Sequence, residues 1–214
     1  MTFLLEGSPS QFKKIIFQED FSSALDKEKW SLYKSSSKVM DGVLVGVEEK
    51  GGGHAAVHGT KGLPEFSDVE VSLRLKFNGS HTTNLAFNDK GYPEVHAGHI
   101  CRVVLQKKQA ILKDGKTGIF RKDIFTKKRE QGKLDKKTMD YVLTKQKKFP
   151  ITLKDGVWYQ VKILIKDDKM EFFIDNKLIG AFESEGIAHL TKDNFAIVTS
   201  KEEVHYDDVV IRVP

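Results

Sequence analysis

The stretch Val69-Glu-Val-Ser-Leu-Arg-Leu-Lys-Phe77 decides the fold. Its apolar residues occupy every second position, and charged or hydroxyl side chains fill the positions between them. Successive side chains of a β-strand point to opposite faces, so this pattern predicts a strand with one buried and one hydrated face. The same alternation recurs in Tyr159–Ile165. Half-buried strands, rather than helices, are therefore expected to build the core.

Other segments support this prediction. Met170–Ile174 follows Tyr159–Ile165 across the polar cluster Lys166-Asp-Asp-Lys169, which favours a turn, so the two runs predict a β-hairpin. Similar short runs recur every ~8–12 residues, with Gly, Asp and Asn turns between them. These runs are Lys14–Phe17, Val43–Val45, Ala55–Val57, Asn84–Phe87, Ile100–Leu105, Leu178–Phe182, Asn194–Thr199 and Asp208–Val213. The absence of a strand–helix alternation predicts a sandwich or barrel, and we expect one all-β domain over residues 1–214, a two-sheet antiparallel β-sandwich of jelly-roll type.

Residues 106–149 interrupt this pattern as a basic insertion. They hold 15 Lys and Arg against 5 Asp and Glu, whereas the rest of the chain holds 20 against 25. The net charge of +5 therefore hides a basic insertion in an acidic sandwich. Apolar residues at helical spacing predict a helix over Leu134–Gln146, preceded by a polar loop through Gly132.

Composition narrows the cellular setting. No apolar run reaches ~18 residues, so we expect no membrane-spanning segment. The start, Met1–Gly7, is too short and too soon acidic for a signal peptide. The protein is therefore expected to be secreted or periplasmic if a leader was removed, and otherwise cytoplasmic. Cys101 is the only cysteine, which excludes an internal disulfide, and its Val/Leu-rich strand predicts a buried, inert thiol.

Three residues form the candidate catalytic centre: Glu94, His96 and His99. Glu94 and His96 share a face if the chain is extended, and His99 joins them only if Gly98 bends or bulges the strand. A carboxylate beside imidazoles suits general acid–base work, or a divalent cation such as Ca²⁺ or Zn²⁺ as cofactor. The alternative is a polar sheet surface on which these histidines bond the backbone, and no metal ligand is assigned.

Further side chains are candidate substrate-binding groups. Asn84 and Asn88 share one strand face, and amides offer sugar hydroxyls both donors and acceptors. Lys192, in a loop, could hold a sugar acid. The alternatives are a simple turn after Asn88 and a solvated loop lysine. The full candidate set is Asn84, Asn88, Tyr92, Arg102, His58 and Lys192.

Several motifs together resemble the concanavalin A-like domains grouped with the 3-keto-disaccharide hydrolase family. They are Glu19-Asp-Phe21 with Trp30, Val39-Met-Asp-Gly42-Val-Leu44, Phe66-Ser-Asp68-Val-Glu70, Gly156-Val-Trp158 and Tyr206-Asp-Asp-Val-Val-Ile211. The resemblance covers roughly residues 17–213, and His58-Gly-Thr60, Gly98–Val103 and Gly186–Lys192 are similar to a subgroup of uncharacterised bacterial secreted proteins. It implies a jelly roll and a role with carbohydrates. Gly91-Tyr-Pro-Glu94-Val-His96 stands where the enzymes of that family carry a Gly-Tyr-Glu-x-Gln-like strand in their sugar cleft.

Asp68 and Glu70 alternate like the acidic residues of family 16 glycoside hydrolases. The third alternate position, which is also acidic in those enzymes, is Ser72 here. We therefore interpret Asp68 and Glu70 as part of a solvated strand face.

The sequence thus predicts a carbohydrate-active domain, a hydrolase or lyase acting on a glycoside or keto-sugar. Two alternatives stay open: a non-catalytic, lectin-like glycan-binding module, and a structural or adhesion domain. The expected partner is a carbohydrate, including an acidic polysaccharide that would meet the basic insertion. Nucleic acid is disfavoured, because the lysines recur at all helical angles and no nucleic-acid motif is present. Catalysis and oligomeric state are left open.

Overall fold

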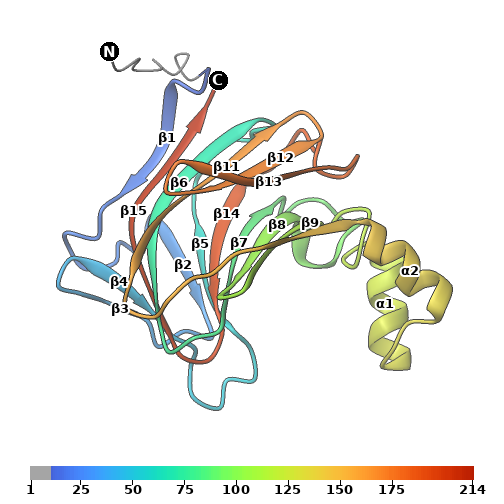
Figure 1. The fold of residues 1–214 in the computed structure, drawn as a ribbon, viewed down its shortest axis with the longest axis horizontal. Helices are drawn as coiled ribbons and strands as arrows, with labels where there is room; N and C mark the ends of the chain where they lie inside the picture. The colour runs from blue at the N-terminus through green and yellow to red at the C-terminus, as the bar shows by residue number, and fades with distance from the viewer. Residues whose placement is uncertain (1–10) are drawn as a thin grey trace.

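The computed structural model describes residues 11–214, which fold as a sandwich of two antiparallel β-sheets (Figure 1). This confirms the expected fold class. The segment Met1–Gly7, on which the argument about a leader rests, lies outside the described residues. Among residues 11–214, no helix is long and apolar enough to cross a membrane.

The larger sheet, sheet A, has eight strands. They are β1 (Lys14–Glu19), β3 (Lys38–Met40), β4 (Val43–Gly46), β6 (Val69–Asn78), β11 (Trp158–Lys166), β12 (Lys169–Ile174), β13 (Lys177–Glu183) and β15 (Glu203–Val213). Their order is β13-β12-β11-β6-β15-β4-β3, with β1 paired to β15. The predicted hairpin is confirmed, since β11 and β12 are antiparallel neighbours joined by a tight turn.

The second sheet, sheet B, has seven strands in the order β10-β9-β8-β7-β14-β5-β2. They are β2 (Trp30–Tyr33), β5 (Ala56–Thr60), β7 (Thr82–Asn88), β8 (His99–Gln106), β9 (Gln109–Asp114), β10 (Gln146–Pro150) and β14 (Asn194–Thr199). Strands far apart in the sequence are neighbours here, because β7 pairs with both β8 and β14.

The core lies between the two sheets. The alternate apolar residues of β6, from Val69 to Phe77, are at most 1% exposed. They share one hydrophobic cluster with Leu85, Phe87 and Cys101 of sheet B, so the prediction of a buried Cys101 is confirmed. Because side chains alternate along a strand, the residues between these on sheet B point to its outer face.

The basic insertion is more regular than expected. Residues 106–149 include β9 and most of β10, which extend sheet B, and a pair of helices, α1 (Lys122–Gln131) and α2 (Lys136–Thr144). The helices stand outside the sandwich, beside β8 and β9 (Figure 1). The helix predicted over residues 134–146 is present as α2, which is shorter by two residues at each end.

The prediction of a polar loop before Gly132 is wrong, because helix α1 occupies this segment. Only Ile124 of α1 is buried, so the helix has almost no apolar periodicity for sequence reasoning to detect. Its end is conventional, since Gly132 takes a left-handed conformation with φ of 71°. Asp135 then caps α2 by accepting a hydrogen bond from the Thr138 backbone N–H.

Candidate functional site

A groove of about 540 Å³ lies on the outer face of sheet B. Strands β5, β7, β8 and β14 form its floor. Phe120, just before α1, and Phe125, within α1, contribute aromatic rings at one side. We define the groove by its polar and aromatic lining residues, which are Ser31, His54, Asn84, Asn88, Lys90, His96, His99, Arg102, Phe120, Phe125 and Asn194.

A short 3₁₀ turn, His96–Gly98, brings both candidate histidines to the groove. Ala97 and Gly98 have positive φ angles of 52° and 70°, so the chain reverses before β8 begins at His99. The two imidazole rings lie 6.1 Å apart. The bend at Gly98 on which the sequence prediction depended is therefore present. A Cβ at Gly98 would clash with the Asp89 carbonyl oxygen, so the close approach requires glycine.

Buried amides orient His99 from below. Asn194 donates through Nδ2 to the Thr60 carbonyl (2.5 Å), which leaves its Oδ1 to accept from Asn88 Nδ2 at 2.8 Å. Asn88 Oδ1 must then accept from His99 Nδ1, also at 2.8 Å. This chain assigns the proton to Nδ1 and leaves Nε2 of the neutral imidazole as an acceptor.

Burial keeps His99 neutral. Desolvation, reinforced by the positive charge of Arg102, lowers the pKa of His99 to about 3. The pKa of His96 is lowered by burial too, and by Arg129 and Arg102. Both imidazoles are therefore uncharged near neutral pH.

Aromatic rings form one wall of the groove. The His96 ring stacks on Phe125 with centroids 3.6 Å apart and planes 7° apart. Phe120 meets His99 edge to face at 4.7 Å, and the Arg102 guanidinium lies over the Phe120 ring at 4.2 Å. These contacts fix the side chains at the wall in defined orientations.

The charge of the groove is one-sided. Lys90 and Arg102 line it together with three histidines, and no Asp or Glu of residues 11–214 does so. Arg102 Nη2 is buried and has no hydrogen-bond partner within the described chain. The described residues therefore give the groove cations, amides and imidazoles, but no carboxylate that could accept or donate a proton.

Five sequence-predicted site residues meet in this groove: Asn84, Asn88, His96, His99 and Arg102. Their convergence could not be read from one strand, because β7, the 3₁₀ turn and β8 all contribute.

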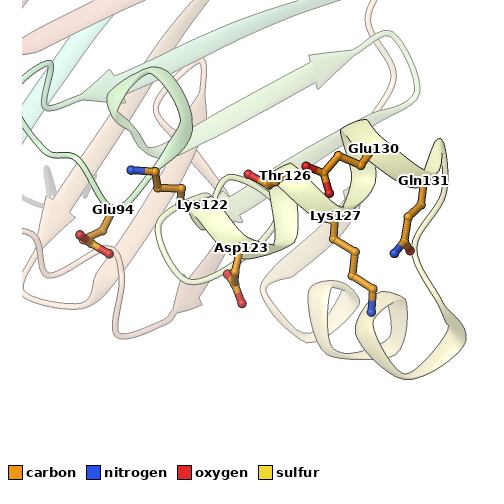
Figure 2. A pocket seen from close by; sticks show the side chains of 7 residues that line it. All are labelled: Glu94, Lys122, Asp123, Thr126, Lys127, Glu130 and Gln131. Carbon is orange, nitrogen blue, oxygen red and sulfur yellow. The ribbon is translucent and has the colours of Figure 1, made fainter.

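Glu94 does not join them. The chain around Glu94 forms turns rather than an extended strand, so Glu94 and His96 do not share a face as the sequence suggested. Glu94 is exposed and lies in a separate hollow beside α1 (Figure 2). Figure 2 shows this hollow, whose other lining residues are Lys122, Asp123, Thr126, Lys127, Glu130 and Gln131. Tyr92 lines a neighbouring hollow and packs against the His189 ring at 4.7 Å, so it too lies apart from the groove.

Two further predictions are corrected by burial. His58 points into the sandwich, is 0% exposed, and bonds Ser35 Oγ and the Ile197 carbonyl. Lys192 is 0% exposed as well, and its ammonium donates to the Ile187 and His189 carbonyls at 3.2 and 2.5 Å. In the first case the strand alternation turns the ring inward. For Lys192, a loop folds over the side chain. Neither His58 nor Lys192 can therefore reach a ligand in the groove.

Sequence reasoning missed Asn194 and the rings of Phe120 and Phe125. Asn194 opens a strand that is apolar until Thr199, and a polar residue at that place could have marked it as a candidate. The two phenylalanines lie in the basic insertion. Its position directly after the His99–Leu105 strand suggests a wall for the site, but no local pattern singles out these two rings.

Residues 11–214 do not bring together the ligands considered for a divalent cation. Glu94 is apart from the histidines, and His99 Nδ1 is engaged by Asn88. Within the described range, no three His, Cys, Asp or Glu side chains are placed to hold a metal ion.

Comparison with known family models and with curated sequences finds no match. Solved structures do share the architecture. A non-specific endo-β-1,3(4)-glucanase, SCLam of family GH16, superposes with a TM-score of 0.62 at 13% identity, covering 96% of this chain and 94% of its own. The carbohydrate-binding module CBM66 from Bacillus subtilis gives 0.58 at 9% identity, covering 86% and 96%. The endo-β-1,3-glucanase from Pyrococcus furiosus gives 0.57 at 13% identity, covering 92% and 93%.

These similarities place the fold among concanavalin A-like jelly rolls, as the sequence predicted. At such low identities they show the fold alone.

Proposed function

We propose that the groove on sheet B binds carbohydrate. The observation that carries the proposal is the convergence of Asn84, Asn88, Asn194 and His99 beside an aromatic wall. The Asn84 amide and the neutral His99 imidazole supply both donors and acceptors for hydroxyl groups, and the rings give one side of the groove an apolar surface. Structural neighbours that are glucanases and a carbohydrate-binding module support the same class of ligand.

Binding without hydrolysis fits the groove best. Most glycoside hydrolases need two carboxyl groups on either side of the scissile bond. No carboxylate of the described residues lines the groove, and Glu94 lies in a different hollow. A lectin-like module is therefore our first proposal, and the hydrolase or keto-disaccharide chemistry implied by the family resemblance is a weaker one. We also propose that the protein is secreted by a bacterium, which agrees with a glycan-binding role.

Elimination is the second candidate function, and one observation favours it: the neutral His99 lies beside the positive Arg102. In β-elimination from a uronic acid, His99 Nε2 would take the proton next to the carboxylate. The bond to the leaving oxygen would break, a C=C bond would form, and water would protonate the leaving oxygen. Arg102 would stabilise the developing negative charge. The low pKa of His99 makes it a weak base, so this candidate ranks second.

The ligand proposal extends to an acidic polysaccharide. Lys90 and Arg102 give the groove a positive charge, and the basic insertion adjoins it. Positive surfaces raise the local concentration of polyanions.

Isothermal titration against a panel of neutral and acidic polysaccharides tests the proposal. We expect the wild type to bind at least one of them, and Asn84→Ala to weaken that binding about tenfold, since an unpaired sugar hydroxyl is costly. Gln160→Ala, an exposed polar change on sheet A, is the matched control and should bind as the wild type does. A wild type that binds no member of the panel overturns the proposal in favour of a structural role. Appearance of an absorbing C=C product would establish elimination.

A further inference from the structure

The outer face of sheet B continues beyond the groove across β8, β9 and β10. Arg102 on β8 is paired with Lys113 on β9, so their side chains lie side by side on this face. Lys113 is in turn paired with Gln146 on β10, and Lys148 follows two residues later, on the same face. The registers thus place three cations in a row that leads away from the groove.

Within residues 11–214, these cations have no carboxylate partners. In the described part of the chain, no ion pair involves Arg102, Lys113, Lys128 or Lys148. They act on one another instead, because burial and the nearby charges of Arg102, Lys148 and Lys128 lower the pKa of Lys113. Like charges placed opposite each other across a sheet are destabilising, so this row costs the free protein stability.

Arg102 lies at the end of the row that borders the groove. Burial lowers the pKa of its guanidinium to about 10, so it keeps its charge at neutral pH. One face contacts the Phe120 ring at 4.2 Å, while Nη2 is buried with no hydrogen-bond partner among residues 11–214. A desolvated donor without a partner is uncommon in folded proteins. The planar fork of arginine matches the two oxygens of a carboxylate or sulfate group.

We infer that Arg102 and Lys113 form an anion subsite that takes the acidic group of a polysaccharide chain entering the groove. This inference rests on the carbohydrate-binding function proposed above and adds the position of the charge. Lys148 on β10 and Lys128 on α1 continue the row of cations. The bound polysaccharide would therefore cross the strands from the groove towards β10. The inserted helices and β10 therefore lengthen the binding face.

A nucleic acid fits this face less well. Stacking of bases needs open aromatic faces. Here His96 covers Phe125 at 3.6 Å and Arg102 covers Phe120 at 4.2 Å, so the rings serve as a wall.

The test measures binding as a function of salt for four acidic probes, alginate, polygalacturonate, hyaluronate and chondroitin sulfate. Neutral laminarin and a single-stranded oligonucleotide are measured in the same way. We expect Arg102→Gln and Lys113→Gln each to weaken binding of the preferred acidic probe about tenfold or more. Each should also flatten its salt dependence. Lys113→Gln, which lies outside the groove, should leave binding of laminarin unchanged. The control is Lys137→Gln, the same charge change at an exposed site on α2, which should alter affinity less than about twofold.

Arg102→Lys is the control for misfolding, because it keeps the positive charge and replaces the planar guanidinium group with an ammonium group. Its melting temperature should match that of the wild type, and its affinity should be intermediate. Laminarin bound as tightly as the acidic probes, with no effect of Arg102→Gln on either, overturns the subsite and leaves the proposed function standing. Equal losses in Arg102→Gln and Lys137→Gln also overturn the subsite. No binding of any glycan overturns both, and tighter binding of a single-stranded oligonucleotide than of every glycan overturns the choice of ligand.

Discussion

Two histidines, His58 and His99, are held neutral by their surroundings. Burial lowers the pKa of His58 to about 4 and that of His99 to about 3. The two residues differ in what their position allows. His58 is sealed inside the sandwich, whereas His99 lines the groove, so only His99 can meet a ligand.

The low pKa of His58 makes stability depend on pH. The unfolded state binds a proton near pH 6.5 and the folded state only near pH 4, so stability is complete above about 6.5 and falls as the pH drops towards 4. His58 alone should remove about 1–2 kcal/mol between pH 6.5 and pH 5. Urea unfolding across this range checks the loss, and His58→Gln should show a shallower pH dependence. His81→Gln, at an exposed histidine, is the control and should keep the wild-type slope. Identical slopes in all three proteins would contradict the assignment.

At the scale of elements, the 3₁₀ turn before β8 decides the shape of the site. It fits because Gly98 has positive φ and lies against the backbone of Asp89, whose N–H donates to the Gly98 carbonyl at 2.9 Å. The sequence identified Gly98 as the residue on which the placement of His99 depends. It could not show that Glu94 leaves the site, because that follows from the turn at residues 93–94, which precedes His96.

Comparison of Gly98→Ala with Gly132→Ala separates the cost of backbone strain from the cost of steric crowding. The new Cβ would clash with the Asp89 carbonyl oxygen, so the turn must shift and the histidines with it. Gly132→Ala is the matched control, since its φ is 71° and, apart from its chain neighbours and its own helix, no atom of residues 11–214 lies within 4 Å of the new methyl position. We expect Gly132→Ala to cost about 1 kcal/mol and Gly98→Ala at least about 2 kcal/mol, with loss of glycan binding. Chemical denaturation and titration measure both effects. Equal costs would mean that the contact with Asp89 is not limiting.

For the whole molecule, the two sheets are tied by more than apolar contact. The Tyr206 hydroxyl on β15 of sheet A lies 2.7 Å from Thr83 Oγ1 on β7 and 2.7 Å from Thr199 Oγ1 on β14. All three residues are 0% exposed. One phenol thus links sheet A to two strands that contribute to the floor of the groove.

Removing this hydroxyl should weaken the whole sandwich. Tyr206→Phe leaves a buried threonine hydroxyl without this partner and should cost about 1–3 kcal/mol, spread over a single cooperative transition. Equilibrium unfolding followed by fluorescence and by circular dichroism measures the loss. Tyr33→Phe removes a hydroxyl from a side chain that is 56% exposed and should change stability by less than about 0.5 kcal/mol. A loss confined to one probe would argue against a link that acts on both sheets.

Local patterns in the sequence were enough to predict the strands and their faces. Alternation in Val69–Phe77 shows which side chains are buried, because the period of a strand is two, and the same rule placed Asn84 and Asn88 together. The site itself depends on contacts that no local pattern contains. Asn88 meets Asn194 across a separation of 106 residues, and Arg102 meets Lys113 through strand pairing. Such contacts follow from strand order and register, which only the tertiary structure supplies. The sequence therefore predicted most of the polar residues of the groove, and the fold decided that they come together.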